Sequence, residues 1–151
     1  MKLGVIGTGA ITKSMLTEYQ RCDKFEIHAI CSRREETGRA MAEAFSIPKV
    51  YTELSAMLAD PEIEIVYVAT PNSIHFSQAK AALEAGKHVL SEIPSVNSVE
   101  EARILKKAVN AHPDLIYMAA ENCCFWAFIE TWKKMREDGL FGDVVYAEAE
   151  Y

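Results

Sequence analysis

The sequence predicts an α/β fold in which helices cover both faces of a doubly wound, mostly parallel β-sheet. Apolar runs of strand length alternate with segments of helical spacing along all 151 residues, which is typical of such sheets with right-handed crossovers. One predicted strand runs into a glycine turn that begins at Gly7, and another ends in polar, helix-starting residues from Thr70 onward. The carboxyl ends of parallel strands meet at one edge of the sheet, so these segments are expected to line a crevice that can hold a dinucleotide.

Short apolar runs indicate the strands, and apolar residues at helical spacing indicate the helices between them. The predicted strands cover residues 2–6, 25–31, 49–51, 63–69, 88–91 and 115–119. The predicted helices cover residues 10–22, 32–45, 53–58, 73–85, 98–111 and 125–138. The run at 63–69 is nearly unbroken, as expected for a strand that is covered on both faces.

Capping residues support several of the helix boundaries. Ser32 and Glu35 have the Ser-x-x-Glu form of a capping box, and Ser98 with Glu101 repeats this form before a later helix. Gly86 is a natural residue just past the end of a helix. These residues predict helices that begin near residues 32 and 98 and a helix that ends at residue 85.

The last residues depart from the alternation. Gly142 and Asp143 predict a turn, and residues 144–151 alternate like a new strand, with nothing after them to pair with. We expect either a fragment of a longer protein or a partner strand from another chain. The alternative is a last strand added to the same sheet.

Composition argues against several classes of binding partner. The formal charge of −6 argues against nucleic acid and against anionic membrane surfaces, and no apolar run approaches the roughly 20 residues that span a bilayer. The first strand follows Met1 too closely for a signal peptide. The four cysteines lack metal-ligand spacing, so free thiols and no metal site are expected. The sequence therefore predicts a soluble cytoplasmic protein.

The glycine turn after the first strand suits a diphosphate. Gly7 and Gly9 allow a tight turn and a close approach of the backbone, and the amides and dipole of the following helix meet the negative charge. The usual third glycine position holds Thr12, so the fingerprint is incomplete. The alternative is a plain turn between a strand and a helix.

The end of the second strand bears on the choice of cofactor. An acidic residue there suits the ribose of NAD, whereas arginine suits the extra phosphate of NADP. This chain has Ser32, Arg33 and Arg34 and no acid, which favours NADP over NAD. Two arginines in a first helical turn would also oppose the helix dipole unless an anion binds. The alternative is that Ser32 only caps the helix and the arginines are solvated.

One of the four histidines stands apart. His75 falls in the first turn of a helix above the carboxyl edge of the sheet, where ligands of this fold collect, so a functional role is favoured. His88 lies inside a strand, and His28 and His112 have no partner pattern. These three are interpreted as structural.

Together these segments resemble the Gfo/Idh/MocA family of NAD(P)-dependent oxidoreductases. The resemblance rests on residues 7–11, on 68–75, on 85–94 and on Glu121 with Asn122. It implies an N-terminal Rossmann domain followed by a larger α/β domain that carries the substrate site and often the oligomer interface. Residues 1–142 would form the Rossmann domain, and residues 143–151 would begin the second domain, with the predicted strand at 144–151 as its first strand. A sugar, cyclitol or related polyol substrate and a homo-oligomer are therefore expected.

The resemblance also implies a set of cofactor-binding residues. Gly7, Thr8, Gly9, Ala10 and Ile11 would lie at the pyrophosphate, and Ser32, Arg33 and Arg34 at the adenosine ribose. Thr70, Pro71, Asn72 and His75 would lie along the cofactor, and Glu92 and Asn122 near the nicotinamide ribose and the substrate.

One residue departs from the family pattern. The Glu-Lys-Pro motif of the family is Glu92-Ile93-Pro94 here. The family lysine assists proton transfer, which isoleucine cannot do. No catalytic residue is therefore assigned: either an acid-base group comes from the missing domain, or the chemistry is different.

Two other functions remain open. Residues 121–125 and 140–143 resemble a branch of the family that cleaves glycosides through transient oxidation of the sugar. A nucleotide-binding module without catalysis is the third possibility, and Ile93 together with the short chain favours it.

Overall fold

The computed structural model describes residues 1–148 and 150, and contacts divide the chain into two compact units, Met1–Ala120 and Glu121–Tyr151. The first unit is built on a six-stranded sheet in the order β3-β2-β1-β4-β5-β6, with every neighbouring pair parallel. The strands are β1 (Lys2–Ile6), β2 (Glu26–Cys31), β3 (Lys49–Tyr51), β4 (Ile65–Val68), β5 (His88–Ser91) and β6 (Tyr117–Ala119). This confirms the predicted doubly wound fold.

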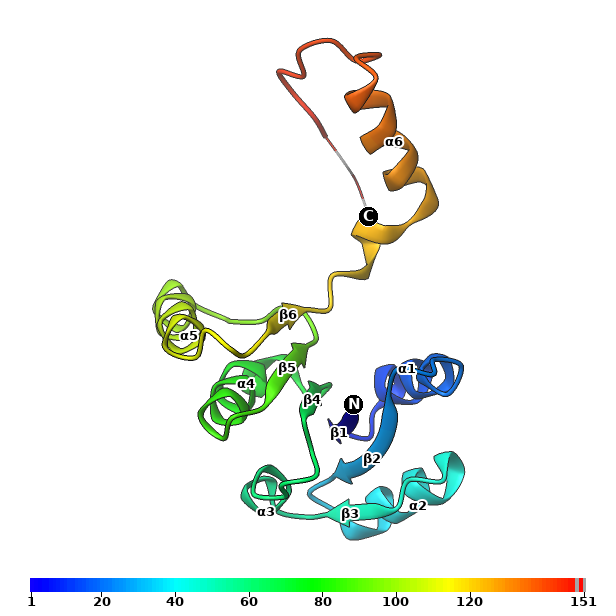
Figure 1. The fold of residues 1–151 in the computed structure, drawn as a ribbon, viewed down its shortest axis with the longest axis vertical. Helices are drawn as coiled ribbons and strands as arrows, with labels where there is room; N and C mark the ends of the chain where they lie inside the picture. The colour runs from blue at the N-terminus through cyan, green and yellow to red at the C-terminus, as the bar shows by residue number, and fades with distance from the viewer. Residues whose placement is uncertain (149, 151) are drawn as a thin grey trace. The chain divides into compact units, whose positions relative to one another are not determined.

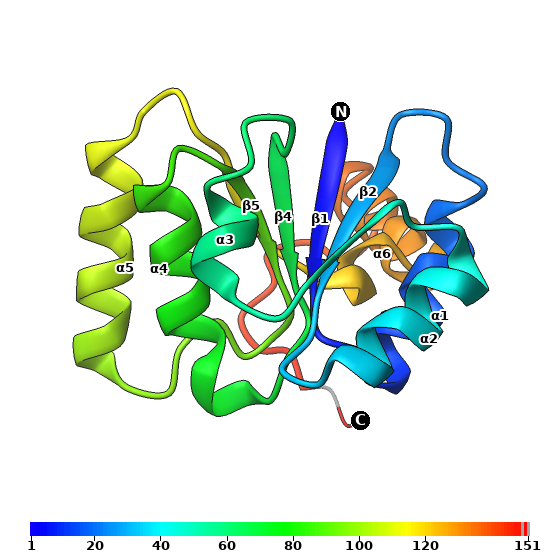
Figure 2. The same cartoon turned by 90° about the horizontal axis from the view of Figure 1, so that it is seen from below.

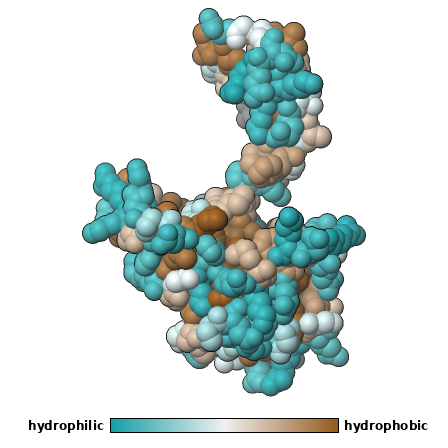
Figure 3. Space-filling model, viewed as in Figure 1, coloured by the Kyte–Doolittle hydropathy of each residue, from teal (hydrophilic) through white to brown (hydrophobic). Residues whose placement is uncertain are grey.

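Helices cover both faces of the sheet (Figures 1 and 2). Those of the first unit are α1 (Ala10–Tyr19), α2 (Glu35–Phe45), α3 (Leu54–Leu58), α4 (His75–Glu84) and α5 (Val99–Ala111), with a 3₁₀ turn at Asn72–Ile74. One apolar core lies under α3, α4 and α5, and a second lies under α1 and α2. The outer face of α5 is hydrophilic (Figure 3). On the same helix, Leu105 is buried in the core.

Most predicted boundaries agree with the structure. The strands at 49–51 and 88–91 are found as predicted, and the helix at 10–22 is shorter, ending at Tyr19. The Ser98 side chain accepts a hydrogen bond from the Glu101 amide at 3.1 Å, so the predicted cap of α5 is present. Gly86 follows α4 with a φ of +76°, a conformation that glycine adopts without strain.

The capping box predicted at Ser32 is wrong. Helix α2 begins at Glu35, its N-cap position is Arg34, and no side chain caps it. The Ser32 hydroxyl instead lies 2.7 Å from the Thr37 hydroxyl. Arg33 therefore precedes the helix rather than opposing its dipole, because the backbone at residue 34 is still extended.

The second unit contains a 3₁₀ turn at Asn122–Phe125 and helix α6 (Ala127–Glu137). The ring of Phe128 contacts the rings of both Trp126 and Trp132. The strand predicted at 144–151 is not formed at residues 144–148 or 150, where no neighbouring strand pairs with the chain; residues 149 and 151 lie outside the described part. In that described part, no helix is both long and apolar enough to span a membrane.

Candidate functional site

A cleft of about 690 Å³ opens at the carboxyl ends of β1, β2 and β4. It lies where the strand order reverses, since β2 flanks β1 on one side and β4 flanks it on the other. Ligands of open α/β sheets bind at this switch point. The two segments highlighted in the sequence, after β1 and after β4, both line this cleft.

Nine of the predicted cofactor residues line the cleft: Gly7, Thr8, Gly9, Ile11, Ser32, Arg33, Arg34, Thr70 and Pro71. Ala10, Asn72, His75 and Glu92 are not among its lining residues. Asn122 belongs to the second unit. The assignment of all these residues to a cofactor stays a prediction.

Gly7 is required by close packing. Its φ is +109°, and a Cβ built at this position would lie 2.2 Å from the carbonyl oxygen of Ala69. The buried Thr12 hydroxyl donates to the same oxygen at 3.4 Å. The residue at the third glycine position therefore ties α1 to the end of β4, which explains how a threonine fits there.

Gly9 has a different role. A Cβ at Gly9 would meet nothing within 4 Å, so its bare backbone borders the open cleft. No side chain caps the amino end of α1, which begins at the next residue. The amide groups and dipole at such a helix start favour an anion. This part of the cleft fits the diphosphate of a dinucleotide.

The cleft wall after β2 is held by a chain of hydroxyl groups. The Thr37 hydroxyl donates to the Arg34 carbonyl oxygen at 2.9 Å, so the hydrogen bond between Thr37 and Ser32 must use the Ser32 proton. Arg33 and Arg34 are exposed, and neither guanidinium forms an ion pair with any described residue. Two unpaired cations therefore border this end of the cleft.

The thiol of Cys31 lies at the end of the same strand, β2. Burial, followed by the nearby Glu53 carboxylate, raises the pKa of Cys31 to about 11.

Several lining residues were missed in the sequence: Ile6, Cys31, Thr37, Thr52, Glu53, Leu54, Ala69, Ile74 and Gln78. Residues 52–54 directly follow β3, so the strand-end rule that singled out Gly7 and Thr70 could have found them. Gln78 had no such signal. Its Oε1 accepts a hydrogen bond from the Thr70 hydroxyl at 2.6 Å, which only the folded chain brings about.

His75 lies behind the cleft rather than in it. Only 1% of its surface is exposed. Its Nε2 lies 2.6 Å from the Thr70 carbonyl oxygen, and its Nδ1 lies 3.0 Å from the Pro94 carbonyl oxygen. The ring therefore joins the loop after β4 to the loop after β5.

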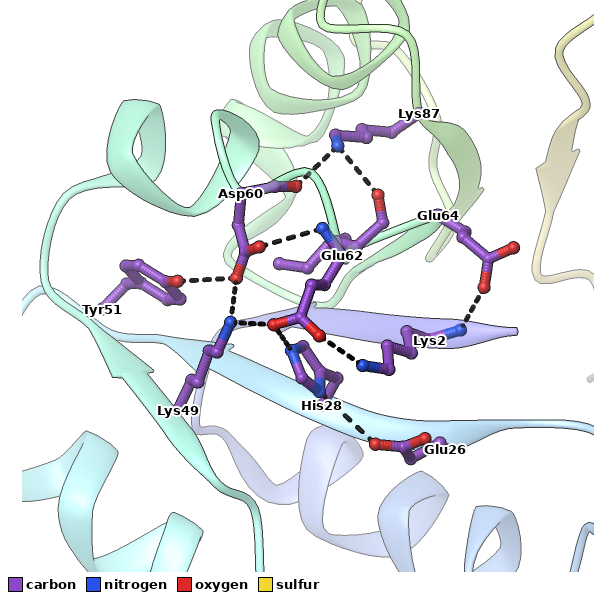
Figure 4. Close-up of polar contacts among 10 residues, drawn as sticks. Lys2, Glu26, His28, Lys49, Tyr51, Asp60, Glu62, Glu64 and Lys87 are labelled. Carbon is purple, nitrogen blue, oxygen red and sulfur yellow. Dashed lines mark hydrogen bonds and ion pairs between the residues drawn. The ribbon is translucent and has the colours of Figure 1, made fainter.

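A second polar cluster lies at the opposite edge of the sheet, near the amino ends of the strands (Figure 4). Lys49 Nζ lies 2.8 Å from Asp60 and 2.6 Å from Glu62, and Lys2 Nζ lies 2.5 Å from Glu62. His28, which had no recognisable partner in the sequence, is buried 3.4 Å from Glu62 and from Glu26. These side chains come together because β1, β2 and β3 align in parallel beside the loop between α3 and β4, which carries Asp60 and Glu62.

The cluster contains the types of side chain that bind metal ions, but its carboxylates already form ion pairs with lysine ammonium groups. Ligand atoms of His28, Asp60 and Glu62 lie within 4.8 Å of one another. Hydrogen bonds from Lys2 and then Lys49 lower the pKa of Glu62 to about 2. Those from Lys49, the Glu62 amide and Tyr51 hold the pKa of Asp60 well below its ordinary value. We assign this cluster to the stability of the sheet.

Comparison with known proteins places this geometry in a family. The model of an oxidoreductase family with an NAD-binding Rossmann fold matches residues 1–120. Oxidoreductase ORF334 of Rhizobium meliloti is 42% identical over 67% of this chain and 30% of its own length. The D-xylose 1-dehydrogenase (NADP(+)) 2 of Haloferax volcanii is 35% identical over 67% of this chain and 31% of its own length. Glycosyl hydrolase family 109 protein 2 of Phocaeicola vulgatus is 29% identical over the whole chain and 38% of its own length.

Solved structures agree on the fold. Scyllo-inositol dehydrogenase from Lactobacillus casei, with bound NAD(H) and scyllo-inositol, superposes with a TM-score of 0.89 at 23% identity, over 95% of this chain and 42% of that chain. Levoglucosan dehydrogenase in complex with NADH and levoglucosan gives a TM-score of 0.86 at 28% identity, over 94% of this chain and 40% of that chain. The chain thus spans well under half the length of these relatives.

Proposed function

The chain belongs to the Gfo/Idh/MocA family of oxidoreductases, and from this premise we propose that it is the cofactor-binding part of a dehydrogenase that transfers hydride between NAD(P) and a sugar, cyclitol or related polyol. The observation that carries the proposal is the open backbone at Gly9, which borders the cleft beside the uncapped amino end of α1. The levoglucosan and xylose dehydrogenases among its relatives support the substrate class.

The residues of the chain bind and orient the cofactor. The amides after Gly9 would hold the diphosphate, and the loop at Thr70 and Pro71 would close the far side of the cleft. When bound, a nicotinamide cofactor supplies the hydride chemistry. Ile93 can neither accept nor donate a proton, so we assign the acid-base group to the rest of the protein.

NADP is the proposed cofactor in preference to NAD. Arg33 and Arg34 line the cleft at the end of β2 without carboxylate partners in the described chain, and a 2′-phosphate would supply the missing anion. The acid in this part of the cleft is Glu53, which belongs to the segment after β3 and not to the ribose position after β2.

The remaining proposals concern the whole protein. Residues 1–142 would form the cofactor domain, and residues 143–151 would begin the substrate domain, through which a homo-oligomer would form. The cysteines Cys22, Cys31, Cys123 and Cys124 are free thiols, which supports a cytoplasmic location.

Calorimetry tests the proposal directly. NADPH and NADH are titrated into the purified chain, and ADP provides a diphosphate without nicotinamide. Saturable binding of NADPH, tighter than that of ADP, is the expected result. The absence of binding of both reduced cofactors at millimolar concentration would reject the proposal. The substrate class is then tested on the full-length protein by NAD(P)H absorbance with xylose, scyllo-inositol and levoglucosan.

A glycosidase is the second candidate, because the glycosyl hydrolase family 109 relative matches the chain over its whole length. The replacement of the motif lysine by Ile93 also removes the usual dehydrogenase proton relay. On this hypothesis the full-length protein releases nitrophenol from a nitrophenyl glycoside while its cofactor is neither consumed nor accumulated. Steady accumulation of NAD(P)H during turnover excludes it.

A further inference from the structure

The sheet consists of two halves of the same design, β1-β2-β3 and β4-β5-β6. At the end of the first pair, Ile6 of β1 lies opposite Cys31 of β2. At the end of the second pair, Val68 of β4 lies opposite Ser91 of β5. The residue after β5, Glu92, therefore occupies in the second half the place that Ser32 occupies in the first.

The equivalent position of Glu92 indicates that it contacts a ribose. In the first mononucleotide-binding half of this fold, an acidic residue after the second strand accepts a hydrogen bond from a ribose hydroxyl. The first half of this chain has no acid there, whereas the second half has Glu92. The Glu92 amide donates to the Val68 carbonyl oxygen at 2.9 Å, which continues the ladder and holds the residue at the edge of the sheet.

A buried tyrosine orients the carboxylate of Glu92 through a hydrogen bond. The Tyr67 hydroxyl donates a hydrogen bond to Glu92 Oε1, and the Tyr67 side chain is completely buried in the core under α1 and α2. The ring of Tyr19 packs edge-on against the Tyr67 ring, with centroids 5.7 Å apart. The phenol is thus held in place, while Glu92 itself is only half-buried.

We propose that Tyr67 is a positioning residue that fixes the Glu92 carboxylate so that its remaining lone pairs accept the hydroxyls of the ribose next to nicotinamide. The inference rests on the proposed function, because it requires a bound dinucleotide whose nicotinamide half extends beyond the lining residues of the cleft to the end of β5. A carboxylate that already accepts one charge-assisted hydrogen bond loses less side-chain freedom when it binds a ribose.

Tyr67 is suited to remain a donor. Burial, followed by the hydrogen bond to Glu92, raises the pKa of Tyr67 far above its ordinary value, so the phenol keeps its proton at any working pH. Tyr19 cannot replace it. The Tyr19 hydroxyl is also buried, but it has no hydrogen-bond partner in the part of the chain that the structure describes.

The pair of tyrosines provides a matched experiment. Tyr67→Phe and Tyr19→Phe each remove one buried hydroxyl from rings in mutual contact. Each variant is titrated with NADH and with ADP, which lacks the nicotinamide ribose. Tyr67→Phe is expected to weaken NADH binding roughly tenfold, as for the loss of a hydrogen bond to a charged group, and to leave ADP binding within about twofold. Tyr19→Phe is expected to change neither by more than about twofold.

A double-mutant cycle tests whether Tyr67 acts through Glu92. Glu92→Gln is expected to weaken NADH binding, and adding Tyr67→Phe is expected to cause no further loss, because the two groups act as one unit. A second readout needs no cofactor. The hydroxyl proton of Tyr67, followed by NMR in the unliganded chain, is expected to shift in Glu92→Gln and to stay unchanged in Tyr19→Phe.

The outcomes separate this inference from the proposed function. Unchanged NADH binding in Tyr67→Phe, an equal loss of ADP binding, or an unshifted hydroxyl proton in Glu92→Gln would overturn the role of Tyr67 alone. If the wild-type chain binds neither NADPH nor NADH, the proposed function fails and the role of Tyr67 fails with it.

Discussion

His75 Nε2 lies 2.6 Å from the carbonyl oxygen of Thr70, a residue that lines the cleft, while His75 itself is buried behind it. On its other side the ring reaches Pro94, so one imidazole spans the two loops that follow β4 and β5. A carbonyl oxygen only accepts hydrogen bonds, so a neutral ring can serve one of the two loops and an imidazolium both. His75, for which the sequence predicts a functional role, therefore also links the two loops.

Removal of this link should destabilise both loops. His75→Leu fills the space but removes the donor that the ring offers to the carbonyl oxygens of the two loops, and we expect the free energy of unfolding to fall by about 1 kcal/mol. Amide hydrogen exchange should also accelerate at Ile74 and Glu92, residues of these two loops whose amides donate to the carbonyl oxygens of Pro71 and Val68. His112→Leu at the end of α5 is the control, with an expected change within about 0.5 kcal/mol. Unchanged exchange in the two loops of His75→Leu would contradict the role.

The two glycines of the first turn should separate packing from binding. Gly7→Ala places a Cβ against the Ala69 carbonyl group at a positive φ, so it should lower the melting temperature clearly. Gly9→Ala places its Cβ in open space at a φ of −79°, so the fold should be unaffected while NADPH binding weakens. Thermal unfolding and cofactor titration of both variants check this. Undiminished NADPH binding in Gly9→Ala would exclude the diphosphate from this turn.

Cofactor choice should depend on the arginines after β2. Arg33→Ala removes one unpaired guanidinium from the cleft and should weaken NADPH binding roughly tenfold, with little effect on NADH. Arg39→Ala, which breaks an exposed pair with Glu35, is the control and should alter neither affinity. Calorimetry with both cofactors provides the measurement. Equal losses of affinity for NADPH and NADH would mean that Arg33 does not bind a 2′-phosphate.

The amino-edge cluster should make stability depend on acid pH. Asp60 and Glu62 have pKa values below their ordinary values of 3.8 and 4.5 in the folded chain, so their contribution is present above about pH 4.5 and is lost as the pH falls toward 2. Lys49→Met removes the ammonium group that both carboxylates share. The variant should be less stable at pH 7, and its stability should fall less steeply in acid.

Urea unfolding between pH 7 and pH 2.5 measures this dependence. Lys80→Met, which removes one partner of the surface pair between Lys80 and Glu84, is the matched control and should retain the steep dependence of the wild type. A Lys49→Met curve parallel to that of the wild type would show that the cluster does not couple folding to protonation.

Much of the fold could be predicted because it rests on local patterns. The strand at 49–51 and the cap at Ser98 depend on neighbouring residues, and the structure has both as predicted. The same local reasoning failed at Ser32, where the motif was present but the hydroxyl bonds to Thr37 instead. It also failed at residues 144–148, because alternation makes a strand only where another strand is available to pair with it.

The sequence by itself determined the alternation of strands and helices, the glycine turn at Gly7 and the edge of the sheet where the cleft opens. These follow from periodicity and from backbone conformations that few residues allow. Only the tertiary structure decided that His75 links two loops, that Tyr67 bonds to Glu92 and that His28 has carboxylate neighbours. Such contacts join residues on separate elements, and the strand register and side-chain directions that create them exist only once the sheet is assembled.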